Sequence, residues 1–364
     1  MKKYRSIAIY LPQYHPLPLN DEAWGKGYTE WTNVTSSKPR FPGHYQPHLP
    51  GDLGFVDLRL EESRIAQAQL AKQFGIDGFC YYHYWFTGRK LMERPFEEVL
   101  STGKPNFPFM LCWANENWSR AWTDRADNLL IEQIYSEEDD RQHIRDLIPA
   151  FKDSRYIRID GKCVFAIWRP LIMPNPDRTL QIFREEAAKE GIELYFIAVE
   201  HNEKTPEYLK HGYDAGMEFQ PHCHYNYSKY RDYSLFRLNK ICKFFFGKAK
   251  IPAINSYKKY MHYVSSKPMP AYKRYPCVMP GWDNAARKKN RAFVCWVGNT
   301  PQLFKEWVIR TFRKFTPFSK EENLIFVNAW NEWGEGCHLE PDLKWRTQFL
   351  EAYKEVTDEY NAEI

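Results

Sequence analysis

Two glutamates three residues apart, Glu332 and Glu335, lie near the end of the chain among tryptophans and glycines. Trp330 and Trp333 flank them, and the apolar run Leu324–Val327 directly before them predicts a buried strand. Two carboxyl groups can divide proton transfer between an acid and a base, and indole faces suit the C–H faces of sugars. The segment therefore predicts a site that acts on glycosidic bonds. The alternative is a solvated loop whose acids face water.

The two carboxyl groups need unlike properties for this chemistry. A general acid must keep its proton near neutral pH, which requires burial or a neighbouring negative charge to raise its pKa. Its partner must be ionised, and a pair of nearby carboxyl groups meets both needs. Chain spacing does not fix the separation of the two groups, so retention and inversion of the sugar stereochemistry both stay open.

The composition excludes several classes of protein. The 364 residues carry a net charge of only +5, which does not require nucleic acid as a partner, and 17% are aromatic, which fits a cleft with stacking surfaces. The eight cysteines form no Cys-x-x-Cys pair, so neither a zinc ribbon nor a disulfide scaffold is expected. A strand follows the first five residues, and no apolar run approaches 18 residues. We expect a cytoplasmic protein, a trimmed signal peptide being the alternative.

Strand-like runs and helical patterns alternate along the chain. The predicted strands are Ser6–Leu11, Gly78–Tyr82, Phe109–Trp113, Lys162–Trp168, Leu194–Val199, Ala215–Phe219, Cys277–Met279 and Leu324–Val327. The predicted helices are Glu61–Phe74, Arg94–Ser101, one capped by Ser136, Leu180–Glu190, Glu207–His211, Pro301–Lys314 and 345–360. Eight alternations with near-continuous apolar strands predict an α/β fold, a single (β/α)8 TIM barrel spanning residues 1–364 as one domain. A doubly wound dinucleotide-binding sheet is less consistent, because no glycine fingerprint follows the first strand.

The active site of such a barrel lies at the carboxyl ends of its strands. Amides, carboxylates, imidazoles and indoles occur there after nearly every predicted strand, and they supply the candidate residues for substrate binding. These are Tyr10, Gln13, Tyr14, His15 and Trp31 at the first strand, His83 and Trp85 at the second, Trp113, Asn115, Glu116 and Trp118 at the third, Glu218 at the sixth, Asp283 at the seventh, and Trp330 and Asn331 at the eighth.

Several of these candidates have a second interpretation. Glu116 either holds sugar hydroxyls or acts as a catalytic acid, Asp283 either binds substrate or caps the following helix, and each tryptophan either stacks on sugar or packs in the core. His15, His83 and His222 are the candidate metal ligands, but no two of them have the spacing of a zinc site. We therefore expect an enzyme without a metal or other cofactor.

Four motifs resemble those of the WbsX-like proteins, which belong with the glycoside hydrolase family 99-like (β/α)8 barrels. The motifs are Ile9–Pro16, Gly27–Trp31, Trp113–Trp118 and Trp330–Gly336, and the resemblance covers essentially the whole chain. Genes for such proteins often accompany those for O-antigen or capsule biosynthesis. The resemblance therefore implies a role with bacterial surface polysaccharides.

Family 99 proper contains endo-acting α-mannosidases, and its motif Asn-Glu-Trp-x-Glu-Gly matches Asn331 to Gly336 here. The resemblance implies that Glu332 acts as a base on the sugar 2-hydroxyl, through an anhydro-sugar intermediate, and that Glu335 is the general acid/base at the glycosidic oxygen. Gly334 stands where family 99 usually has histidine, and Cys337–His338 departs as well. These differences concern the substrate more than the acid pair.

A basic, aromatic segment, residues 226–275, separates the sixth and seventh predicted strands. Its 12 lysines and arginines and single acid give it a net charge of +11, against +5 for the whole chain. Three interpretations stay open: a solvated basic surface packed on the barrel, the wall of a groove for an anionic glycan, or a peripheral contact with a membrane that carries a lipid-linked saccharide.

These observations predict a metal-independent glycoside hydrolase that cleaves a bacterial surface polysaccharide with the pair Glu332 and Glu335. The expected partner is an oligosaccharide or polysaccharide, and no nucleic acid is expected. A glycosyltransferase of surface polysaccharide biosynthesis is one alternative, although no Asp-x-Asp motif for a metal–nucleotide donor occurs. A non-catalytic glycan-binding protein is the other. The sugar, the linkage, endo or exo action and the oligomeric state do not follow from the sequence.

Overall fold

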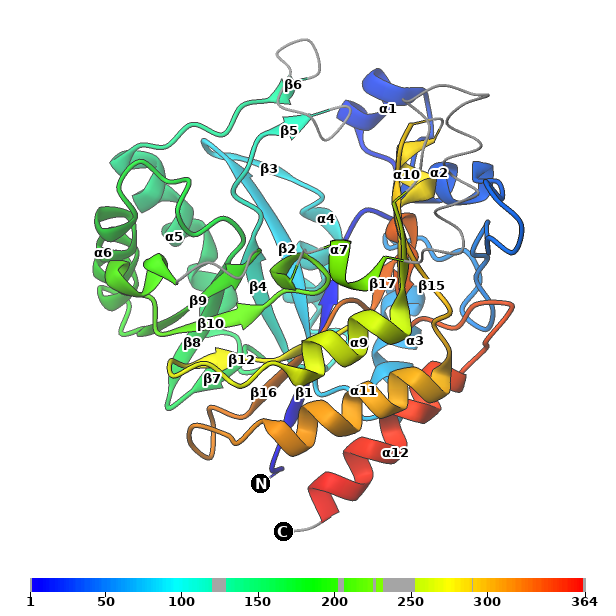
Figure 1. Ribbon diagram of the computed structural model, residues 1–364. Helices are drawn as coiled ribbons and strands as arrows, with labels where there is room; N and C mark the ends of the chain where they lie inside the picture. Colours follow the sequence, from blue (N-terminus) through cyan, green and yellow to red (C-terminus); the bar gives the residue numbers. More distant parts are fainter. Residues whose placement is uncertain are drawn as a thin grey trace.

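A ring of parallel strands forms the centre of the protein in the computed structural model, which describes residues 2–119, 129–201, 206–224, 227–231, 253–289 and 291–362 (Figure 1). The strands of this ring, in chain order, are β1 (Arg5–Tyr10), β2 (Gly78–Phe86), β4 (Phe109–Trp113), β8 (Lys162–Ile167), β9 (Leu194–Glu200), β10 (Ala215–Glu218), β12 (Arg274–Tyr275) continued by β13 (Cys277–Val278), and β16 (Leu324–Val327). Each of the eight predicted strands is present.

The ring closes through one extended segment that proline divides into β12 and β13. β12 pairs with β10 and β13 pairs with β16, both in parallel. Pro276 between them has no N–H to donate, but its carbonyl oxygen accepts a hydrogen bond from the Phe326 N–H at 2.9 Å. Closure confirms the predicted (β/α)8 barrel, and the seventh strand begins at Arg274, ahead of the predicted Cys277.

Helices cover the outside of the ring (Figure 1). They are α3 (Glu61–Gln73), α4 (Arg94–Thr102), α5 (Glu137–Lys152), α6 (Pro176–Ala188), the 3₁₀ helix η2 (Glu207–His211), α9 (Tyr257–Ser266), α11 (Pro301–Lys314) and α12 (Gln348–Ala362). The predicted cap at Ser136 is confirmed, since its side chain accepts a hydrogen bond from Asp139 N. β4 and β9 are buried at every position, because helices cover one face and the packed interior covers the other.

Short elements that the sequence did not predict extend the barrel. They are α1 (Pro18–Trp24), α2 (Glu30–Ser36), β3 (Arg89–Leu91), β5 (Trp118–Ser119), β6 (Leu129–Ile131), β7 (Arg158–Ile159), η3 (His222–His224), α7 (Tyr227–Tyr230), β11 (Ala253–Ser256), β14 (Trp282–Asp283), α10 (Ala285–Lys288), β15 (Val294–Val297), β17 (Asn331–Glu332), η5 (Trp333–Glu335) and β18 (Cys337–His338). β11, β15 and β14 form a separate three-stranded sheet. α2, α10 and η5 contact one another, which brings three distant parts of the chain to one place.

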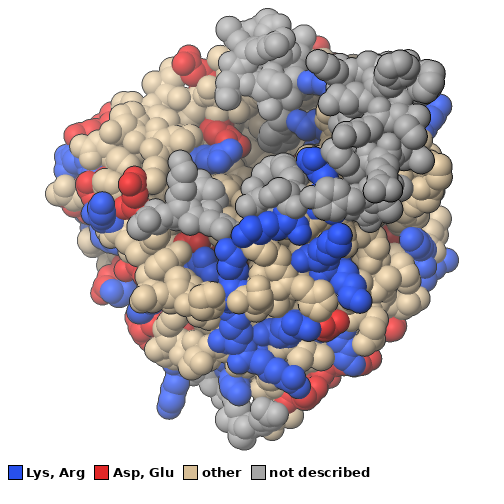
Figure 2. Space-filling view, viewed as in Figure 1, with Lys and Arg blue, Asp and Glu red and all other residues tan. Residues whose placement is uncertain are grey.

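The structure describes residues 227–231 and 253–275 of the basic segment, and the rest of the segment lies outside the described residues. α9 and β12 within it are parts of the barrel itself. Figure 2 shows lysine and arginine side chains gathered over the region of α9 and α11. Within the described part of the chain, no helix combines the length and the apolar character needed to cross a membrane.

Candidate active site

A cavity of about 520 Å³ opens among the loops at the carboxyl ends of the barrel strands. Both acids of the predicted pair, Glu332 and Glu335, line it. Its wall also carries the predicted binding residues Glu116 and Trp118, the candidate metal ligand His222, and several side chains that were not predicted to bind substrate. Those are Tyr82, Tyr84, Trp168, Arg169, His201, Trp282, Arg287 and Lys288. The volume is typical of a site for a small molecule or an oligosaccharide segment.

One guanidinium group joins three carboxyl groups beside this cavity. Arg287 donates from Nη2 to Glu332 Oε2 at 2.7 Å and from Nε to Glu30 Oε1 at 2.8 Å, and its Nη1 lies 3.0 Å from Glu335 Oε1. Arg287, Glu30 and Glu332 are buried, whereas the Glu335 side chain is 22% exposed. Glu335 is therefore the more accessible of the two acids.

The loop after β1 holds the acid segment in place. The Asn331 amide accepts from the Leu11 N–H at 2.7 Å and donates to the Leu11 carbonyl at 3.0 Å. The Tyr14 hydroxyl donates to the Asn331 carbonyl and accepts from the Trp333 N–H. Asn331 and Tyr14 thus fix the backbone on both sides of Glu332, and neither side chain lines the cavity.

The acid cluster holds a proton near neutral pH. Burial raises the pKa of Glu332 to about 8, against the opposing pull of Arg287 and with the support of the negative charges of Glu335 and Glu30. Burial also raises the pKa of Glu335. One guanidinium cannot neutralise three carboxylates, and the two acids titrate as a coupled pair. An acid–base pair of this kind needs one protonated and one ionised member, and the cluster favours that state.

The predicted Glu116 lines the same cavity as the acid pair, and both of its carboxylate oxygens accept hydrogen bonds. It accepts hydrogen bonds from Trp168 Nε1 at 3.1 Å and from Arg169 Nε at 2.9 Å. Asn115 supports this arrangement, because its amide bonds to the N–H and the carbonyl of Arg169. The carboxylate is held in one orientation toward the cavity, which suits it to bind sugar hydroxyls.

β2 is longer than predicted, and its alternation changes which side chains reach the cavity. Tyr82 and Tyr84 line it, while His83 and Trp85 face α5. His83 Nε2 lies 2.9 Å from His143 Nε2, and Trp85 Nε1 donates to the Asp139 carboxylate at 2.9 Å. The structure therefore does not bring His83 and Trp85 to the acid pair. A strand extended to Phe86 would have selected the two tyrosines from the sequence.

Other candidates of the first, third and eighth strands belong to the protein interior. Tyr10 donates from its hydroxyl to Gln67, Trp113 packs on His143, and Trp330 packs on Phe79. Gln13 and His15 are buried as well, and Trp31 donates from Nε1 to the Val56 carbonyl while it packs on Trp333. None of these six side chains lines the cavity.

Asp283 and Glu218 also bond to residues outside the cavity wall. Asp283 accepts hydrogen bonds from the Ala285 N–H in the first turn of α10 and from Gln46, while the N-cap residue of α10 is Asn284. Burial favours the neutral form of Glu218, but Arg274 and His224 outweigh it and lower its pKa to about 2. Neither residue lines the cavity.

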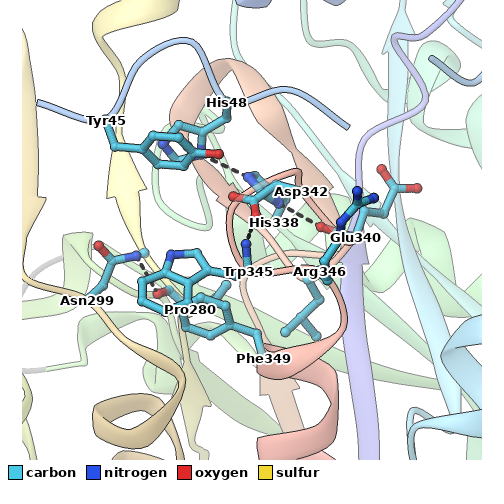
Figure 3. Close-up of a pocket in the computed structure, with 13 residues that line it drawn as sticks. Tyr45, His48, Pro280, Asn299, His338, Glu340, Asp342, Trp345, Arg346 and Phe349 are labelled. Carbon is cyan, nitrogen blue, oxygen red and sulfur yellow. Dashed lines mark hydrogen bonds between the residues drawn. The ribbon is translucent and has the colours of Figure 1, made fainter. Parts of the chain in front are cut away.

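Two groups of described residues have the types and proximity of metal ligands: His48, His338 and Asp342, and Glu218, Cys223 and His224. Figure 3 shows the first, beside a small cavity of about 20 Å³. His48 Nδ1 lies 2.9 Å from His338 Nε2, the His338 Nδ1 bonds the Glu340 carbonyl, and Asp342 accepts from the Trp345 N–H. These atoms satisfy one another, and in the second group Glu218 is paired with cationic Arg274. Neither group includes a residue that lines the large cavity.

We therefore expect chelation to leave activity unchanged. In the predicted chemistry Glu332 and Glu335 transfer the proton and Arg287 provides the positive charge, so no metal cation is required. Turnover of a glycan substrate before and after dialysis against EDTA measures this. A loss of activity that Zn²⁺, Mn²⁺ or Ca²⁺ restores would contradict the prediction and give a role to His48, His338 and Asp342.

An eight-stranded parallel barrel that gathers carboxyl groups and aromatic rings at the carboxyl ends of its strands is a (β/α)8 barrel with a candidate active site at that end. The chain belongs to the family described as "Glycosyltransferase WbsX", which it matches over residues 6–353. The match confirms the resemblance drawn from the four motifs.

Two curated relatives, both called "Uncharacterized protein WxcX" and from two strains of Xanthomonas campestris pv. campestris, are 34% identical over 351 residues. The alignment covers 96% of this chain and 49% of each relative, so the chain spans about half the length of the curated relatives it matches.

Solved structures share the fold at low sequence identity. A "Glycoside hydrolase-like protein" superposes with a TM-score of 0.59 at 15% identity, covering 99% of this chain and 94% of that one. The GH99 endo-α-mannosidase from Bacteroides thetaiotaomicron superposes with a TM-score of 0.56 at 13% identity, covering 98% of both chains. At these identities the likeness establishes the barrel, and activity has to be argued from the site.

Proposed function

We propose that this protein cleaves glycosidic bonds of a bacterial surface polysaccharide of the O-antigen or capsule type, with Glu332 and Glu335 as the acid–base pair. The observation that carries the proposal is the buried pair on the shared guanidinium of Arg287, at the wall of an aromatic-lined cavity. Membership of the WbsX family and the glycoside hydrolase barrel support the substrate class.

In the proposed reaction Glu335 protonates the departing glycosidic oxygen, because it is the more exposed member of the pair. Glu332, which is 5% exposed, is the proposed base that removes the proton from the attacking oxygen, which is a water molecule or the sugar 2-hydroxyl. For this step the proton that the raised pKa of Glu332 favours in the free protein has to pass to Glu335 when the sugar binds. Arg287 bonds both carboxylates and stabilises the negative charge that moves from one to the other. General acid–base steps of this kind contribute roughly 100- to 10,000-fold each.

Aromatic rings supply the surface on which a sugar would lie. Tyr82, Tyr84, Trp118, Trp168 and Trp282 all reach the cavity. Their faces match the apolar faces of pyranose rings, while Glu116, already oriented by Arg169, accepts hydrogen bonds from hydroxyl groups. The wall therefore combines stacking with directional polar contacts, as a saccharide site requires.

Glycosyl transfer is a second candidate, because the family carries a glycosyltransferase description. The same acid pair would then pass the glycosyl group to a sugar hydroxyl in place of water. Product analysis distinguishes the two. Incubation with the surface glycan of the source bacterium in H₂¹⁸O should give products with ¹⁸O at new reducing ends. Longer chains without ¹⁸O would identify a transferase.

A glycan-binding protein without turnover is the third candidate, and the same glycans test it. Glu335→Gln should keep binding and lose product formation if the proposal holds. Equal binding by wild type and Glu335→Gln, with no product from either on any glycan that binds, would establish a binding protein and overturn the proposed hydrolysis. Cytoplasmic location is part of the proposal, and fractionation of the source cells tests it.

The basic surface predicts a contact with anionic glycan or membrane lipid. Lys258 and Lys259 of α9 are exposed, and Figure 2 shows this face rich in lysine and arginine. Attraction between charges is screened over about 8–10 Å near physiological salt, so binding to phosphatidylglycerol vesicles should weaken as salt rises. We expect the double substitution Lys258→Gln, Lys259→Gln to weaken it further. The matched control is Lys72→Gln, Lys104→Gln on α3 and the loop after α4, and equal binding by both pairs at all salt concentrations would contradict the prediction.

A further inference from the structure

Glu30 is a third carboxyl group at the acid pair, and the reaction proposed above does not use it. It begins α2 in the long loop after β1, and its side chain is 2% exposed. Its Oε1 accepts a hydrogen bond from Arg287 Nε at 2.8 Å. A carboxylate is seldom buried so completely without a reason, and a single bond to an arginine that already serves two other acids does not neutralise it.

The acid segment is shaped around this carboxyl group. A β-carbon built on Gly334 would lie 1.6 Å from Glu30 Oε1 and 2.9 Å from Arg287 Nε. The backbone of Gly334 is outside the left-handed region, so its conformation alone would accept alanine. The space for a side chain at position 334 is instead occupied by the carboxyl group of Glu30. The absence of a side chain at position 334 therefore makes room for the carboxyl group of Glu30.

The N–H donors of Arg287 bond to carboxyl groups of elements that lie far apart in the chain. Nε serves Glu30 of α2, while Nη1 and Nη2 serve Glu335 and Glu332. A guanidinium is a rigid planar fork, so a partner at Nε fixes the direction of both terminal nitrogens. Removing the carboxylate at Nε would take away one of the three carboxylates that fix the direction of the fork.

Other ionisable groups lie around the cluster on several elements. They are Lys288 of α10, Tyr14 and Tyr28 of the loop after β1, Tyr82 and Tyr84 of β2, and Cys337 of β18. Burial raises the pKa of Cys337 and of all four tyrosines, so these five groups stay neutral below pH 9. The charges that matter between pH 5 and 9 are therefore those of the three glutamates, Arg287 and Lys288.

We propose that Glu30 is a positioning residue for the acid pair: it aims Arg287 at Glu332 and Glu335, and its negative charge helps the pair to retain a proton. The role of Glu30 in catalysis rests on the proposed function. Its effects on the direction of Arg287 and on the protonation of the acid pair concern the protein without substrate. A like charge nearby disfavours ionisation, and Glu30 raises the pKa of both Glu332 and Glu335 in this way.

Thermal unfolding against pH tests the proposal without a substrate. The pKa of Glu332 is about 8 in the folded protein and about 4.3 in an unfolded chain, so the folded state binds its proton more tightly. The stability this group contributes is full below the unfolded value and is lost as pH rises toward 8. The Tm of Glu332→Gln relative to wild type should therefore rise between pH 5 and 8 and level off above.

The same comparison is then made in a Glu30→Gln background. Without the negative charge of Glu30 the folded pKa of Glu332 falls. The pH at which the Tm difference stops rising, the levelling pH, should therefore be lower by about one unit or more. Glu22→Gln, an exposed glutamate of α1, is the matched control and should leave the curve in place. Levelling off at the same pH in both backgrounds would reduce Glu30 to a structural residue and overturn the proposal.

Gly334→Ala provides a second test that does not depend on Glu30→Gln folding. Its new β-carbon must push the Glu30 carboxyl group away from Arg287, so the levelling pH should fall as it does in Glu30→Gln. Combining Gly334→Ala with Glu30→Ala, which empties the space, should recover Tm lost by Gly334→Ala alone. An unchanged levelling pH in Gly334→Ala, or no recovery in the double variant, would contradict the proposal. Because no substrate is used, failure here is distinct from failure of the proposed hydrolysis.

Discussion

Glu335→Gln and Glu332→Gln should each lower kcat by about 100- to 10,000-fold while the protein stays folded, since each removes one of the two proposed proton-transfer groups. Glutamine keeps the shape of the side chain and can still accept a hydrogen bond from Arg287. Near-ultraviolet circular dichroism and Tm check the fold, and steady-state turnover of the surface glycan measures the effect. Activity within about threefold of wild type in either variant would remove that residue from the mechanism.

Glu116→Gln is the control for this prediction. It lies on the same cavity wall and is bonded to Trp168 and Arg169, but it is separate from the cluster on Arg287. A residue that binds sugar hydroxyls contributes to substrate binding, so its substitution should raise KM more than it lowers kcat. If Glu116→Gln lowers kcat as strongly as Glu335→Gln, then Glu116 takes part in proton transfer, which was its alternative interpretation from the sequence.

The barrel could be predicted because its signals are local. Apolar runs such as Leu194–Val199 alternate with amphipathic helices, and strands such as β9 are buried along their whole length. The seventh strand was predicted too short because Pro276 interrupts it, and the pairing of its two halves with β10 and β16 shows that it closes the ring. A local pattern identifies elements, whereas closure depends on partners far apart in the chain.

The acid pair could be predicted for the same reason, since Glu332 and Glu335 lie together in one motif. The arginine that carries the opposite charge beside this pair could not be predicted. Arg287 is 45 residues from Glu332 and 257 from Glu30, in a basic run that resembles a solvated helix face. His83 and Trp85 were wrongly predicted to reach the site. The last residues of β2 were treated as a loop, so the alternation of the strand was not applied to them.

Arg287→Gln should destabilise the protein by about 3–5 kcal/mol at pH 8, because it removes the cation shared by three buried carboxyl groups. For a chain of this length that loss corresponds to a fall in Tm of roughly 4–6 °C. The comparison is with Arg291→Gln, since Arg291 is exposed on the loop after α10 and its loss should leave Tm nearly unchanged.

The pH dependence of the Arg287 variant distinguishes a charge effect from a packing effect. Without the cation the folded pKa values of Glu332 and Glu335 should rise further above the unfolded value of about 4.3, so both groups prefer their neutral form when folded. A raised folded pKa means stability that is complete at low pH and is lost as pH rises. The Tm deficit of Arg287→Gln should therefore shrink from pH 8 to pH 5, as Glu332 and Glu335 take up protons. A deficit that stays constant over this range would show that Arg287 contributes through packing alone, and the shared counter-ion would lose its role in setting the protonation of the acid pair.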